Sequence, residues 1–205
     1  MLPLNLNNTF SINFSSSELN EKSIQEFVRT IEDSGIEPGR VMVEITGRFS
    51  DDAYLIRENR QFLHKHGIRI AIDFFSSGFS SYVVFTDMPI DVIKLSRSIT
   101  SHAGNERGYS LIKSIIAFAK EMGIKTVAEG IENEEQARLC SQAGIDYLQG
   151  YHFSVPRLLK DVEQDLDLVK TPSVSPDARN PEALSNPGIS VIRKNDAISG
   201  TSKDE

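Results

Sequence analysis

Short apolar stretches alternate with longer amphipathic ones, and this alternation limits the possible folds more than any other feature of the chain. The short stretches are mostly rich in Val, Ile or Phe, as strands covered on both faces require. They are TFSINFS (9–15), RVMVEIT (40–46), IRIAIDF (68–74), DVIKLS (91–96) and IKTVAEG (124–130), with a sixth strand expected in DYLQGYHFSVP (146–156). The repeated strand–helix order predicts a parallel sheet with helices packed outside it. Right-handed crossovers leave an open doubly wound sheet or a (β/α) barrel.

Four amphipathic segments separate these strands, and each ends at a glycine. In residues 20–35, apolar residues recur at helical steps of three and four, at Ile24, Phe27, Val28 and Ile31. The expected helix stops are Gly35, Gly67, Gly123 and Gly144. The single cysteine, Cys140, lies in the last helical segment, where it is expected to be a buried residue and not a nucleophile.

The composition changes after about residue 158. Residues 159–170 are expected to form a terminal helical segment, and residues 171–205 a disordered tail, because that stretch is rich in Pro, Ser, Asn and Asp and has no periodic face. The predicted domain therefore spans residues 1–158. A complete eight-stranded barrel typically needs about 200 residues or more, so this domain is expected to be an incomplete barrel.

Charge and hydropathy exclude several classes of protein. The formal net charge of −7 argues against nucleic-acid binding, which needs a basic surface. No apolar run approaches the roughly 18 residues of a membrane span, and the first residues lack a signal-peptide pattern. With one cysteine and no secretory signal, a cytoplasmic location is expected.

Polar residues recur near the carboxyl ends of successive predicted strands: Asn13, Glu44, Asp73, Lys94, Glu129 and, on the sixth, Gln149. In parallel α/β folds these ends share one rim. An oxygen-rich set without cysteine or paired histidine favours Mg²⁺, Mn²⁺ or Ca²⁺ over zinc. Each residue alone is also explained as a cap, a turn acceptor or a solvated side chain. Their recurrence at one level of five successive units favours the functional interpretation.

Several motifs, in order, resemble those of the EAL domain, a bacterial phosphodiesterase module that linearises cyclic di-GMP with two divalent metal ions on a TIM-like barrel. They are SINFSS, VMVEITGRF, MPIDVIKLSRSIT, TVAEGIENEEQA and QGYHFSVP. The resemblance covers residues 8–158 and implies an incomplete TIM-like (β/α) barrel of the EAL type.

The resemblance also assigns roles to individual residues. It implies that Mg²⁺ or Mn²⁺ is bound by four ligands, namely Asn13, Glu44, Asp73 and Glu129. Lys94 corresponds to the active-site lysine, Glu132 to a residue that steadies the neighbouring loop, and Gln149 to a residue of the binding site.

Departures from the family pattern predict impaired catalysis. No Glu-Ala-Leu tripeptide is present, and the resemblance begins near the family's second strand, so the first strand and its ligand glutamate are expected to be missing. Phe74 stands where the family has a second aspartate, Ser76 and Ser77 replace a Gly-Thr pair, and Ser96 replaces an aspartate. Two metal ions about 3.5–4 Å apart need several carboxylates to offset their repulsion.

Three hypotheses follow. The chain is a degenerate EAL protein that binds cyclic di-GMP or a protein partner, with a homodimer among the possible assemblies. Alternatively, it is a metal-dependent phosphodiesterase, producing linear pGpG, whose sequence is incomplete. The third hypothesis is a structural remnant without a ligand.

Overall fold

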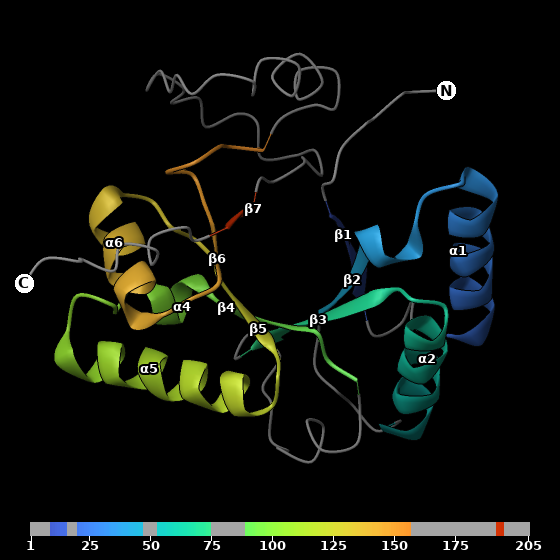
Figure 1. Cartoon of the computed structure of the whole chain (residues 1–205), viewed down its shortest axis with the longest axis horizontal. Helices are drawn as coiled ribbons and strands as arrows, with labels where there is room; N and C mark the ends of the chain where they lie inside the picture. The colour runs from blue at the N-terminus through green and yellow to red at the C-terminus, as the bar shows by residue number, and fades with distance from the viewer. Residues whose placement is uncertain (1–8, 16–19, 47–52, 75–88, 157–191, 195–205) are drawn as a thin grey trace, which may run out of the picture. The chain divides into compact units, whose positions relative to one another are not determined.

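The computed structural model describes residues 9–15, 20–46, 53–74, 89–156 and 192–194 (Figure 1). The chain divides into two compact units. The first comprises residues 1–96 and 114–127, and the second comprises residues 97–113 and 128–205.

Parallel strands form the framework of the first unit. The strands β1 (Phe10–Ser15), β2 (Val41–Thr46), β3 (Arg69–Phe74) and β4 (Val92–Leu95) pair side by side in sequence order. Strand β5 (Lys125–Ala128) follows β4 in the strand order. The backbone N–H of Lys125 donates to the carbonyl of Asp91 at 2.9 Å. The predicted parallel sheet and the positions of its first five strands are therefore confirmed.

Helices α1 (Glu21–Ser34) and α2 (Ala53–Lys65) lie along one side of these strands (Figure 1). Asn20 caps α1 by accepting from the N–H of Ser23 at 3.0 Å, and a short 3₁₀ helix, η1 (Pro38–Arg40), leads into β2. Alternate residues of β2 and the apolar stripe of α1 are buried in one cluster, because successive strand residues face opposite sides. The cluster contains Ile24, Val28, Ile31, Val41, Val43, Ile45, Leu63, Ile68 and Ile70.

Arg60 is a buried charge that the sequence analysis did not single out. Its side chain on α2 is fully buried, and loss of hydration lowers the pKa of its guanidinium to about 10. The group therefore stays protonated at neutral pH. Periodicity gave no signal for it, because an arginine among polar helix residues reads as part of the solvated face.

The second unit contains α4 (Arg97–Thr100), α6 (Glu134–Ala143) and β6 (Tyr147–Gln149), which pairs antiparallel with β7 (Ile192–Lys194). Helix α5 (Glu106–Glu121) contributes residues to both units. Cys140 on α6 is fully buried, as predicted, and desolvation raises the pKa of its thiol to about 11. A protonated thiol at that position is a packing residue.

All four predicted helix stops are confirmed: Gly35, Gly67, Gly123 and Gly144 have positive φ and follow the helices. The elements η1, α4 and β7 were not predicted. Residues 192–194 form a strand within the segment expected to be a disordered tail. The rest of residues 159–205 lies outside the described residues, as do Ser76 and Ser77, so the domain boundaries remain a prediction.

Replacing Ile70 with alanine tests the packing of the first unit. Ile70 is fully buried on β3, so Ile70→Ala should lower the free energy of unfolding by about 2–5 kcal/mol. Urea denaturation measures the change. Leu111→Ala is the control, because Leu111 is 44% exposed and its truncation should cost much less. Equal losses in the two variants would contradict the described core.

Candidate active site

A buried ion pair joins β2 and β4. Lys94 Nζ donates to Glu44 Oε2 at 2.6 Å, and the two side chains are only 3% and 12% exposed. Ser11 Oγ donates to the other carboxylate oxygen, Oε1. A carboxylate removed from water needs a positive partner and hydrogen bonds, and Glu44 has both. The alternative interpretation of Lys94 as a solvated side chain is therefore wrong.

Strand register places the other predicted residues of the first unit on the same face of the sheet. Asn13 pairs with Glu44, and Asp73 pairs with Lys94. Glu44 pairs with Ala71, two residues before position 73, so positions 44 and 73 share one side of the sheet. This side is opposite to the one that α1 covers, since residues 41, 43 and 45 face that helix. The side chains of Asp73 and Phe74 lie outside the described residues.

In the second unit, Glu129 lies in the loop directly after β5. The sequence had predicted that it lies within the strand. Thr100 Oγ1, which is buried on α4, donates to the backbone carbonyl of Glu129 at 2.7 Å. This bond holds the peptide that carries the predicted ligand. The helix that carries the donor, α4, was not predicted, because a four-residue helix has no periodic pattern.

The loop after Glu129 packs against the turn after β6. The N–H of Ile131 donates to the carbonyl of Gln149 at 3.1 Å, and the N–H of His152 donates to the carbonyl of Ile131 at 3.0 Å. A Cβ on Gly150 would lie 2.1 Å from the Ile131 carbonyl oxygen. Only glycine allows this approach, which explains the Gln-Gly-Tyr sequence in physical terms.

Glu132 forms an ion pair with Arg97 on α4, at 2.8 Å between Oε1 and Nη2. Its backbone N–H donates to the side chain of Gln136 at 2.8 Å, next to the Asn133 cap of α6. The expected role of Glu132 in steadying the neighbouring loop stays a prediction, because residues 75–88 lie outside the described residues. Arg97 is a partner that the sequence analysis missed.

The side-chain carbonyl of Gln149 is a buried acceptor. Its Oε1 has no hydrogen-bond partner within the part of the chain that the structure describes. Leaving such an atom unpaired costs free energy, so buried unpaired acceptors often mark a place where a water, ion or ligand binds. This observation supports the assignment of Gln149 to a binding site.

The oxygen donors of the first unit fit a hard divalent cation. Glu44 offers a carboxylate that already holds an ammonium group, and Asn13 offers an amide oxygen on the adjacent strand. Among the described residues no group of three or more His, Cys, Asp or Glu side chains is close enough to hold a metal ion. The complete ligand set stays a prediction.

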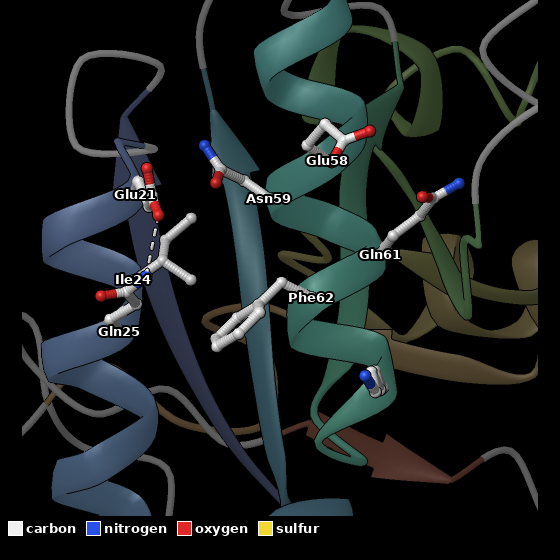
Figure 2. Close-up of a pocket in the computed structure, with 8 residues that line it drawn as sticks. Glu21, Ile24, Gln25, Glu58, Asn59, Gln61 and Phe62 are labelled. Carbon is white, nitrogen blue, oxygen red and sulfur yellow. Dashed lines mark hydrogen bonds between the residues drawn. The ribbon is translucent and has the colours of Figure 1, made fainter.

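A separate hollow lies between α1 and α2 (Figure 2). Asn59 and Phe62 extend from α2 toward α1, whereas Glu58 and Gln61 point away. On α1, Gln25 donates to Glu21 at 3.0 Å, so these polar groups bond to each other. The hollow is on the helix-covered side of the strands and includes none of the predicted site residues.

Comparison with known proteins matches the chain to one family. The EAL domain family model matches residues 3–156, and the chain therefore belongs to the EAL domain family. A probable cyclic di-GMP phosphodiesterase of Escherichia coli, PdeN, is 32% identical over 168 residues, which cover 80% of this chain and 32% of PdeN.

Solved EAL structures share the fold. The EAL domain of Mycobacterium smegmatis DcpA has a TM-score of 0.74 and 28% identity, covering 80% of this chain and 75% of that one. The EAL enzyme Bd1971, with cAMP and cyclic di-GMP bound, has a TM-score of 0.71 and 29% identity, covering 78% of this chain and 43% of that one. The predicted EAL-type (β/α) fold is confirmed.

The chain spans a third or less of the first curated relatives that it matches, from 32% of one to 18% of another. Klebsiella pneumoniae BlrP1, whose fold is similar, has been solved as calcium and manganese complexes with cyclic di-GMP, with 23% and 22% identity. Within the described residues, no helix has the length and apolar character to cross a bilayer.

Removing Lys94 tests the buried pair. Lys94→Met should lower the free energy of unfolding in metal-free buffer by about 3 kcal/mol, because the Glu44 carboxylate stays buried without a counter-ion. The double variant Lys94→Met/Glu44→Gln should lose less, since no charge remains unpaired. Both are measured by urea denaturation.

Lys22→Met is the matched control for this cycle. Lys22 lies 4.0 Å from Glu26 in an exposed pair, so its loss should change stability by less than about 1 kcal/mol. If Lys94→Met loses no more free energy of unfolding than Lys22→Met, the buried pair does not stabilise the Glu44 carboxylate.

Proposed function

We propose that this chain binds cyclic di-GMP together with a divalent metal ion and hydrolyses it poorly. The observation that carries this proposal is the Glu44–Lys94 pair, in which a family ligand carboxylate is held, largely dehydrated, on the face of the strands opposite α1. When the two groups separate, the carboxylate can bind a cation and the ammonium group can bind an anionic dinucleotide.

The residues that would hold the metal are the ligands that the family resemblance implies, Asn13, Glu44, Asp73 and Glu129. When bound, a divalent ion neutralises phosphate charge and lowers the pKa of its water. Glu44 would then compensate the metal, which releases the ammonium of Lys94 to donate to a phosphate oxygen. The buried Oε1 of Gln149 would accept a hydrogen bond from the ligand or its water.

The low turnover is proposed from Phe74. The family has an aspartate at this position, and phenylalanine has no lone pair to offer a second ion. Phe74 thus removes one of the carboxylates that two divalent ions about 3.5–4 Å apart would need to offset their repulsion. A chain that binds cyclic di-GMP without hydrolysing it efficiently would act by contacting another protein. We therefore infer a protein partner or a second copy, in the cytoplasm.

Titration calorimetry and a turnover assay test the proposal. With Ca²⁺ present the purified chain should bind cyclic di-GMP, and with Mn²⁺ it should hydrolyse it about 100-fold more slowly than an active EAL domain assayed in parallel. Turnover equal to that of the active domain would overturn the impairment and support the phosphodiesterase hypothesis. Absence of both binding and turnover would support a structural remnant.

Gln149→Met separates ligand binding from folding. The variant removes an acceptor that has no partner among the described residues, so the melting temperature of the ligand-free chain should stay equal or rise. Its affinity for cyclic di-GMP should fall by about 10-fold, the cost of one hydrogen bond to a charged or polar ligand. Gln142→Met, on the exposed side of α6, is the control. Lower stability with unchanged affinity would refute a binding role for Gln149.

A further inference from the structure

Two residues of the short helix α4 hold the loop that carries Glu129. Thr100 Oγ1 donates to the backbone carbonyl of Glu129 at 2.7 Å, as described above. Arg97, almost one helical turn earlier, contacts the next part of the loop through both its stem and its guanidinium. The contacts of Arg97 follow from two separate observations.

The first observation is the packing of Gly130 on the stem of Arg97. A Cβ on Gly130 would lie 2.6 Å from Arg97 Cβ and 2.7 Å from its Cγ, distances that real Cβ atoms do not reach. Gly130 also has a φ of +66°, which favours glycine. The loop backbone therefore rests directly on the methylene groups of Arg97, with no side chain between them.

The second observation is the ion pair at the far end of the same side chain. Arg97 Nη2 lies 2.8 Å from Glu132 Oε1, with the two side chains 68% and 43% exposed. An exposed pair contributes little to stability by itself. Here, however, it fixes the guanidinium over the loop, so that one side chain contacts residues 130 and 132 at once.

The opposite side of the loop is also fixed. The N–H of Ile131 donates to Gln149, and that of Glu132 donates to Gln136. These two bonds hold the amides of Ile131 and Glu132, and the peptides of Glu129 and Gly130 come directly before them in the chain. Arg97 and Thr100 contact that part of the backbone.

We propose that Arg97 is a positioning residue, which sets the direction of Glu129 by holding Gly130 and Glu132 against α4. The catalytic consequence rests on the proposed function, in which Glu129 binds a metal ion. A ligand misplaced by a fraction of an ångström weakens metal binding, because partners around metal ligands typically contribute 10- to 100-fold in affinity or activity.

Arg97→Met tests this role, because methionine keeps an unbranched stem and removes the guanidinium. Hydrogen exchange of the Ile131 and Glu132 amides should become about 10-fold faster. The Kd for Mn²⁺ should rise about 10-fold, and residual kcat should fall by a similar factor with KM unchanged. Arg97→Lys, which keeps a cation within reach of Glu132, should restore most of each value.

Arg138→Met is the matched control. Arg138 is an exposed arginine of α6 that donates to Gln142 of the same helix at 3.0 Å, so none of the values should change. Unchanged amide exchange in Arg97→Met would overturn the proposal. Faster exchange with unchanged Mn²⁺ affinity would also overturn it, since the contact would then be structural only.

The exchange measurement also keeps the two proposals distinguishable. If the parent chain binds neither Mn²⁺ nor cyclic di-GMP, the proposed function fails. Amide exchange in Arg97→Met then decides alone whether Arg97 holds the loop, with faster exchange supporting the contact and unchanged exchange refuting it.

Discussion

The alternation of side chains along parallel strands is the constraint on which the first unit depends. On β2, residues 41, 43 and 45 are apolar and buried against α1, which leaves residue 44 to face the other side. Hydrophobic burial on one face thus fixes the register of the charged residues on the other. A shift of one residue would turn Glu44 toward the helix and three aliphatic side chains toward the face that carries Lys94. The packing of the core therefore positions the ion pair with Lys94.

In the second unit, the main structural requirement is to fix the irregular loop of residues 129–132. The loop of residues 129–132 buries Ile131, and hydrogen bonds, one ion pair and two glycines that allow close backbone contact hold the rest of its backbone. Each contact is weak alone. Together they fix successive peptides from both sides, which is how a loop can present a carboxylate with the precision that a metal site needs.

The family pattern and its departures carry different kinds of information. Motifs such as TVAEGIENEEQA identified the family because they combine helix caps, tight glycines and site residues, all of which are local requirements. Phe74 is a local departure whose effect depends on charge balance among residues far apart in the sequence. Membership of the family therefore does not decide the rate of hydrolysis, and the proposal of weak turnover rests on electrostatics.

Sequence alone determined the strands, the main helices and their glycine stops, because hydrophobic period and capping residues are local signals. It also selected Glu44, Lys94 and Gln149 as site residues. Tertiary structure decided that Lys94 is buried on Glu44, that Arg60 is enclosed, and that Arg97 reaches Glu132. These three facts depend on which distant segments pack together, and a charged residue has the same local pattern whether it is solvated or paired.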